Sequence, residues 1–173
     1  MSNNIYINFI KDELHSNNNE NVYLKKEKIL VRKTGNKLIA VLDTNQYYTD
    51  QSIYNLYLKK NKKVNLKFIT ALLNSKLLNF YFNKKMITNA DVFPYIKGIH
   101  LKKLPIKINN NVINEEIIDC VIEIEKLPST LKENSIKIDL LTYKLYDLNY
   151  YEVKLIDLNF NLTQEEYNNY QIN

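Results

Sequence analysis

Few residues in this sequence could carry nucleophilic or metal chemistry. It contains two histidines, His15 and His100, and a single cysteine, Cys120. These residues could not close a zinc site without several carboxylates, and their spacing matches no zinc-binding pattern. Cys120 lies among apolar neighbours in "EEIIDCVIEIE", which predicts a buried helical thiol rather than a nucleophile. We therefore expect no metal site and no catalytic centre of the Ser-His-Asp or Cys-His kind.

The pattern nearest to a catalytic motif is Glu152-Val153-Lys154, with Asp139 and Asp147 upstream. A metal-dependent nuclease could use an acid-x-Lys pair to hold magnesium and to position water. That chemistry needs the pair on a strand beside an aspartate on a neighbouring strand. The surrounding "LYDLNYYEVKLID" has instead the pattern of a helix or loop. Ordinary surface charges are therefore the favoured interpretation, and a magnesium-dependent nuclease is kept as an alternative.

Cations are the most abundant groups that could bind a ligand. Residues 1–107 carry 19 Lys or Arg against 7 Asp or Glu, a net charge of +12, whereas residues 108–173 carry 5 against 12, a net charge of −7. A basic part of this size could bind a polyanion, and the acidic remainder suggests a protein neighbour. A well-solvated lysine-rich surface is the alternative interpretation of the same charges.

The elements that would position these cations begin with "ILVRKTGNKLIAVLD". Two apolar runs flank Gly35-Asn36, and glycine supplies the positive φ that the first central position of a type II′ turn needs. We expect a β-hairpin with strands at 28–34 and 37–43. A loop, a further strand and a lysine-rich turn at 59–63 follow.

Helices dominate the rest of the chain. Helical spacing in "VNLKFITALLNSKLLNFYFNKK" predicts one helix from an N-cap at Asn65 to the Lys84-Lys85 pair. Two prolines in segment 86–108 predict extended pieces and a short turn. An acidic helix should begin at an N-cap at Asn114 and end near Pro128. We expect further helices at about 135–147 and after Thr163, which forms a capping-box pattern with Glu166.

This order predicts a mixed α/β fold, with a small sheet and packed helices followed by C-terminal helices. We expect two parts, a basic domain at 1–110 and an acidic helical region at 111–173. The acidic helix has an apolar stripe that would either pack on the basic domain or dock a partner. Its members are Ile117, Ile118, Val121 and Ile124.

The basic part offers groups suited to DNA. Lysines and arginine converging on one face would neutralise phosphates, while Asn, Gln, Arg or Tyr side chains could contact bases. Lys25, Lys26 and Lys28 belong to the same basic cluster, and Lys97, Lys102 and Lys103 follow in the proline-bearing segment. The candidate DNA-contacting residues are Arg32, Lys33, Asn36, Lys37, Asn45, Tyr47, Tyr48, Lys59, Lys60, Lys62 and Lys63. Alternatively, the tyrosines belong to the core and the lysines solvate strand edges.

Four stretches in order resemble the TaqI-like C-terminal specificity domain, the target recognition domain of adenine-N6 DNA methyltransferases and fused restriction–modification enzymes. The first three stretches are "ILVRKTGNKLIAVLDTNQYYTDQSIYNL", "LKFITALLNSKLLNFYF" and "VFPYIKGIHLKKLPI". The fourth, "IDLLTYKLYDLNYYEV", resembles the helix and turn that usually follow such domains, with Asp147 where glycine is common. Together they cover roughly 25–155. The resemblance implies a mixed α/β recognition domain whose loops enter the DNA major groove.

The resemblance also implies roles for the recurring motif residues. Gly35 would serve the turn, Asn74 and Ser75 would make a helix-to-sheet contact, and Pro94 and Pro105 would set the path of the loop. Base reading in such domains belongs to the variable loops, which here include the candidate residues named above.

Methyltransferase motifs are absent from this sequence. It has neither a glycine-rich cofactor motif nor Asn-Pro-Pro-Tyr, and its only Pro-Tyr pair is Pro94-Tyr95. The resemblance therefore implies a non-catalytic specificity module without a cofactor. It would position double-stranded DNA for a separate DNA methyltransferase, with an endonuclease as a further partner. The alternative from a different class is a protein-interaction subunit that lacks DNA binding.

Location can be predicted from three features. A lone cysteine suits a reducing cytoplasm, and no run approaches the ~18 apolar residues of a membrane span. The start "MSNNIYINFIKDE" also lacks the charged-then-apolar order of a signal peptide. We expect a cytoplasmic protein that does not bind membranes.

Overall fold

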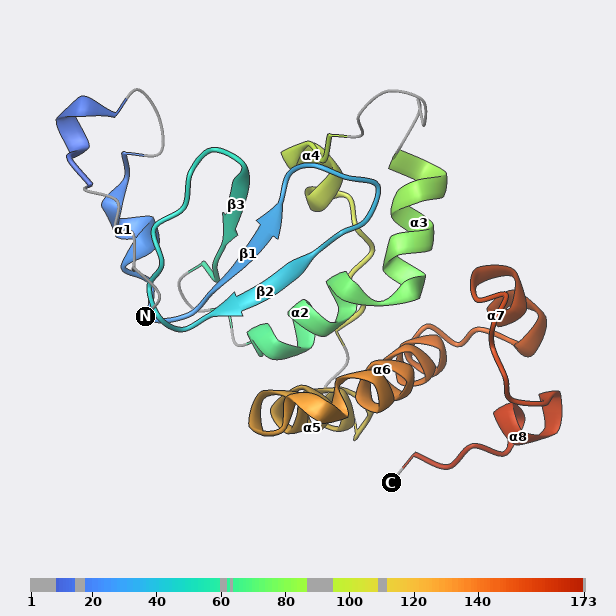
Figure 1. Cartoon of the computed structure of the whole chain (residues 1–173). Coiled ribbons are helices and arrows are strands. Elements are labelled where there is room, and N and C mark those ends of the chain that lie inside the picture. Colours follow the sequence, from blue (N-terminus) through green and yellow to red (C-terminus); the bar gives the residue numbers. More distant parts are fainter. Residues whose placement is uncertain are drawn as a thin grey trace.

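The computed structural model describes residues 9–14, 18–59, 62, 64–86, 95–108 and 112–172. At its centre lies a three-stranded antiparallel sheet in the order β2-β1-β3 (Figure 1). The strands are β1 (Lys28–Arg32), β2 (Ala40–Asp43) and β3 (Ile53–Leu56). Lys28 faces Asp43 at one end of the hairpin, and Val31 faces Ala40 near the other. The predicted hairpin and mixed α/β fold are thus confirmed, although the strands are shorter and the connection between them spans residues 33–39.

Two helices replace the single helix predicted after β3. They are α2 (Leu66–Asn74) and α3 (Lys76–Met86), and the backbone of Ser75 between them is extended, with φ −64° and ψ 152°. The Ser75 hydroxyl donates to the Leu72 carbonyl at 2.7 Å and accepts from the backbone N–H of Leu78 at 3.3 Å. It therefore ends one helix and caps the next. The predicted N-cap at Asn65 is confirmed, because its side chain accepts from the backbone N–H of Lys67.

Short elements flank this centre. A 3-10 helix (Lys11–Glu13) and α1 (Glu20–Tyr23) precede the sheet, and α4 (Gly98–Lys102) lies in the proline-bearing segment. That segment was predicted to hold only extended pieces and a turn, so a helix there is a correction.

The C-terminal helices begin with α5 (Val112–Lys126), which starts before Asn114. Asn114 is buried inside the helix, so its prediction as N-cap was wrong. A 3-10 helix (Pro128–Thr130) interrupts the chain as expected, and α6 (Leu131–Leu145), α7 (Tyr150–Ile156) and α8 (Gln164–Asn168) follow. The Thr163 capping box with Glu166 is confirmed.

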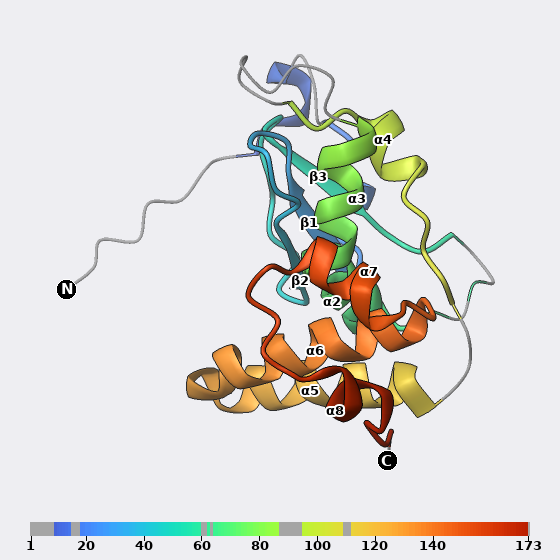
Figure 2. The same cartoon turned by 90° about the vertical axis from the view of Figure 1, so that its right-hand side faces the viewer.

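The acidic helices share the main apolar core with the sheet. Figures 1 and 2 show α2 and α3 on one side of the sheet, with α5 and α6 packed beyond α2. Ile117 and Ile118 of the α5 stripe are buried in that core, and Val121 and Ile124 are half-buried against it. The stripe therefore lies against the chain's own core. Within the part of the chain that the structure describes, no helix combines the length and apolarity needed to cross a membrane.

Candidate nucleic-acid interface

Two asparagines attach the helices to the outer edge of the sheet. β2 is an edge strand, and the side chain of Asn74 accepts from the backbone N–H of Ala40 at 3.0 Å and donates to the Ala40 carbonyl at 2.8 Å. Asn79 accepts from the N–H of Leu38 at 2.7 Å. These bonds satisfy backbone groups that an edge strand would leave open. The predicted sheet contact of Asn74 is confirmed, whereas that of Ser75 was wrong, since Ser75 bonds only within the helix junction.

The connection between β1 and β2 is held on both sides by backbone hydrogen bonds. The N–H of Lys33 donates to the Ser52 carbonyl at 2.9 Å, and the N–H of Ile96 donates to the Lys33 carbonyl at 2.7 Å. Thr34 and Tyr95 form an isolated antiparallel bridge. The backbone of the hairpin tip is therefore fixed between the start of β3 and the segment before α4.

Side chains at this tip remain largely in solvent. Arg32, Asn36 and Lys37 are exposed, and Lys33 is half-buried with its ammonium 4.5 Å from the centre of the Tyr54 ring. That distance is typical of a cation–π contact. Gly35 has φ +109°, which confirms that glycine serves the turn.

Further cations gather at the same end of the molecule. Figure 1 places the hairpin tip, α4 and the C-terminal end of α3 together, and the rings of Phe82 and His100 approach to 6.1 Å between the two helices. Burial, and then the charges of Lys97 and Lys103, lower the pKa of His100, so its ring is mostly neutral at pH 7. We define the tip surface as Arg32, Lys33, Asn36, Lys37, Tyr95 and Lys97, flanked by the exposed Lys84, Lys85, Lys102 and Lys103.

The opposite end of the hairpin contains a buried ion pair. Lys28 has 0% side-chain exposure and Asp43 has 1%, and the ammonium donates to the Asp43 carboxylate and to the Tyr23 carbonyl. Asp43 also accepts from the backbone N–H groups of Asn45 at 2.8 Å and Tyr47 at 2.9 Å. Lys28 is thus not a surface cation, and its inclusion in the basic cluster was wrong.

This ion pair organises the loop that follows β2. Gln46 adopts a left-handed backbone with φ +58°, and its side chain donates to the Leu24 carbonyl at 2.9 Å. Tyr48 stacks on Tyr23 with ring centres 4.6 Å apart and donates to Glu20 at 2.7 Å. The ring and hydroxyl of Tyr48 are therefore engaged with α1.

The predicted contact residues thus fall into two groups at opposite ends of the sheet. Arg32, Lys33, Asn36 and Lys37 lie at the tip. The other group adjoins the Lys28–Asp43 end, because β2 ends at Asp43 and Leu56 at the end of β3 pairs with Ile29. We call it the base group, and it consists of Asn45, Tyr47, Tyr48, Lys59 and Lys62. Lys60 and Lys63 lie outside the described residues. Tyr95 was not predicted at the tip, since its pairing with Thr34 spans 61 positions and leaves no local pattern.

Both charged residues of the acid-x-Lys pattern form hydrogen bonds with backbone groups near them in the chain. Glu152 accepts from the N–H of its helix cap Asn149 at 2.8 Å, and Lys154 donates to the Phe160 carbonyl at 3.0 Å. Both lie on α7, which is a helix rather than a strand, and Asp147 pairs with Lys107. Over the described ranges, no group of three His, Cys, Asp or Glu residues is placed to hold a metal ion.

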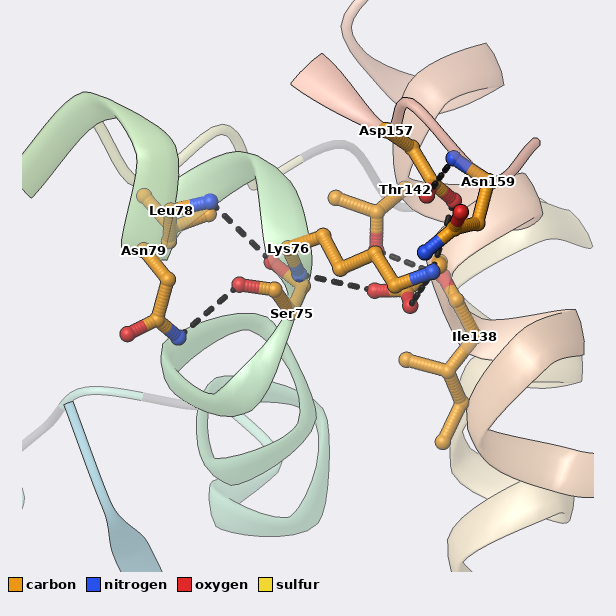
Figure 3. Close-up of polar contacts among 9 residues, drawn as sticks. Ser75, Lys76, Leu78, Asn79, Ile138, Thr142, Asp157 and Asn159 are labelled. Atoms are coloured by element: carbon orange, nitrogen blue, oxygen red, sulfur yellow. Dashed lines mark hydrogen bonds and ion pairs between the residues drawn. The ribbon is translucent and has the colours of Figure 1, made fainter. Parts of the chain in front are cut away.

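Asp139, the remaining acid of that pattern, belongs to a contact between α3 and the C-terminal helices. Its carboxylate accepts from the backbone N–H of Lys76 at 2.8 Å, and Figure 3 shows the Lys76 side chain reaching to Asp157, 2.7 Å away. Burial raises the pKa of Asp139 to about 6, against smaller opposing effects of Lys76. The group ties α6 and α7 to the junction of α2 and α3. Burial likewise raises the pKa of the Cys120 thiol, and the prediction that this thiol is buried in a helix is confirmed.

The fold is a mixed α/β module in which helices pack on a small antiparallel sheet. A turn with exposed cations lies at one end of the sheet, and such a turn suits an anionic ligand. The model of the TaqI-like C-terminal specificity domain matches residues 1–106, and the chain belongs to this family. The predicted resemblance is thereby confirmed. Membership indicates a DNA sequence-specificity module of methyltransferase-type restriction–modification systems. No curated protein sequence matches the chain.

The family match includes the whole sheet, α2, α3 and α4, and both groups of predicted contact residues. It ends at Ile106, before α5. The stretch at 138–153, which also resembled the family, lies beyond the match.

Proposed function

We propose that this chain is a non-catalytic specificity module that binds duplex DNA through its tip surface and positions it for a separate adenine-N6 DNA methyltransferase. The family match supports the DNA-recognition role. The observation that carries the choice of surface is the support of its backbone, because Lys33 bonds to Ser52 on one side and to Ile96 on the other. Among the described residues, Arg32, Lys33, Lys37 and Lys97 form no ion pair, so their charges are available to phosphates.

The shape of the tip supports duplex DNA as the ligand. A two-stranded β-ribbon fits the major groove, which is about 12 Å wide. The backbone of the tip is fixed on both sides by Ser52 and Ile96, so its side chains project from a rigid support. A preorganised surface loses less entropy on binding than a mobile loop would.

The base group lies at the other end of the sheet. Four residue steps separate Lys28 from Arg32 along β1, about 13 Å at strand spacing. Tyr48 is already engaged with α1, while Asn45, Tyr47, Lys59 and Lys62 are exposed. We propose that these exposed residues do not share the primary DNA contact of the tip surface.

Charge reversal at the two ends tests this proposal. The double variant Lys33→Glu/Lys37→Glu removes the tip cations, and Lys26→Glu/Lys59→Glu makes the same change in charge at the base end. Binding to a fluorescent duplex is measured by anisotropy between 50 and 200 mM salt. We expect the tip variant to lose binding and the slope of log K against log salt to fall by about 2. The base variant should keep most of the binding affinity and most of the salt slope.

Two outcomes would contradict the proposal. Equal losses in both variants would indicate unspecific attraction to net charge. No effect in either variant, with both folded by circular dichroism, would favour the protein-interaction subunit without DNA binding.

Catalysis is assigned to a partner in this proposal. The sequence carries neither a glycine-rich cofactor motif nor Asn-Pro-Pro-Tyr, so we propose that a methyltransferase subunit supplies methyl transfer, with an endonuclease as a further partner. Such a complex would act in the cytoplasm, where the DNA is. Incubation of the isolated chain with duplex DNA and labelled S-adenosylmethionine should give no methylation. Incorporation of label into adenine would contradict the non-catalytic role.

A further inference from the structure

The chain contains a single arginine among its 24 basic residues, and this arginine, Arg32, stands at the hairpin tip. Lysine supplies a compact point charge, whereas arginine supplies a planar fork of five donors. A protein that uses lysine at the other 23 positions has no need of arginine for charge alone. The property that distinguishes position 32 is therefore the geometry of the guanidinium.

The guanidinium lies against the turn at Gly35. A Cβ built on Gly35 would lie 2.5 Å from Nη2 of Arg32 and 3.3 Å from Cζ, so the guanidinium covers the face of the turn where a side chain would be. Any other residue at position 35 would also be strained by the φ of +109°. Glycine is thus needed for the turn, and a side chain at position 35 would displace the guanidinium of Arg32.

The donors of Arg32 are unused within the described part of the chain. Its side chain is exposed, and neither an ion pair nor a hydrogen bond to a described residue engages the guanidinium. The neighbouring Lys33 differs, because its ammonium lies over the Tyr54 ring. Arg32 therefore lies against the turn with its donors open to a ligand.

We infer that Arg32 reads a guanine, donating from its fork to O6 and N7 in the major groove. This inference rests on the proposed function. Both phosphate and guanine accept a bidentate arginine. Guanine is favoured because Lys33, Lys37 and Lys97 belong to the same tip surface and can neutralise phosphates as point charges, whereas bidentate base reading needs the planar donor pair that only arginine supplies.

Selection from a pool of random duplexes tests the inference. The wild-type chain should enrich a site that contains at least one G·C pair. Arg32→Lys keeps the charge but removes the fork, so we expect the affinity for unrelated duplexes and the salt slope to be retained while discrimination at one G·C pair falls about 5- to 150-fold. Gly35→Ala, which displaces the guanidinium, should reduce the discrimination at the same G·C pair. Lys37→Ala is the matched control and should weaken binding to all sequences alike.

The outcomes separate the two proposals. The inference is overturned if a folded Arg32→Lys variant keeps its preference for the G·C pair while Arg32→Ala loses affinity for all sequences alike, with a salt slope lower by about 1. That combination identifies a phosphate contact. Binding of all duplexes equally by the wild-type chain overturns it as well. Absence of DNA binding by the wild-type chain overturns the proposed function itself. Since Gly35→Ala could fail to fold, Arg32→Lys decides the result.

Discussion

Removal of the buried ammonium by Lys28→Met should strongly destabilise the protein. Both side chains of the Lys28–Asp43 pair are almost wholly inaccessible to solvent. Without Lys28, the carboxylate keeps the N–H groups of Asn45 and Tyr47 among the described residues, and it lacks a cationic partner in a site that water does not reach. Breaking a buried pair by removing one partner costs about 3–5 kcal/mol. Two retained hydrogen bonds to Asp43 favour the lower end of this range.

Urea unfolding at pH 7.5 and 25 °C, followed by circular dichroism, measures the cost. The double variant Lys28→Met/Asp43→Leu completes a cycle, because it removes the charge that the single variant leaves behind. We expect the double variant to be less destabilised than the sum of the single variants, with a coupling energy of about 2–3 kcal/mol. It should not recover wild-type stability, since Asn45 and Tyr47 lose their acceptor.

A solvent-exposed ion pair provides the control. Lys67 pairs with Glu125, and their side chains are 24% and 44% exposed. Lys67→Met should cost less than about 1 kcal/mol. If Lys28→Met costs no more than this control, or if the single changes are additive, the argument from burial fails.

Two further predictions concern the contacts of α3 and its neighbours. Asn74→Ala leaves the backbone N–H and C=O of Ala40 without their partner and should lower the free energy of unfolding by about 2–4 kcal/mol. Asn83→Ala is the control, because it loses one hydrogen bond within its own helix, and it should cost under about 1 kcal/mol in the same urea assay. The folded pKa of Asp139, about 6, lies above its ordinary value of 3.8, so the native state binds the proton more tightly and this group stabilises the fold as pH falls. Relative to Asp139→Asn, the wild type should gain about 1.4 kcal/mol between pH 8 and pH 5, and no gain would contradict the burial of this carboxyl.

Local side-chain chemistry made several elements predictable. Gly35 marks the hairpin connection because few other residues adopt a positive φ. Asn65 and Thr163 mark helix starts because their oxygens accept backbone N–H groups two or three residues ahead. Each of these signals is complete within a few positions of the chain.

Partners distant in the sequence decided the remaining features. The helix predicted from Asn65 onward breaks at Ser75, and the neighbouring Asn74 is bonded to Ala40, 34 positions away. Lys28 looks like its exposed neighbours in the sequence, yet it is buried because the hairpin register sets it against Asp43. Neither result follows from helical spacing or charge.

A basic, hairpin-containing part, acidic helices and membership of a family of specificity domains could all be predicted from the order of the residues. The tertiary structure alone decided that the candidate contacts divide between two ends of the sheet, because strand direction separates residues 32–37 from residues 45–48 although they are close in the chain. It also placed Tyr95 beside Thr34 and the guanidinium of Arg32 over Gly35. Composition and periodicity show which side chains are present in the sequence. The packing of the backbone decides which of these side chains lie close enough together to contact one ligand.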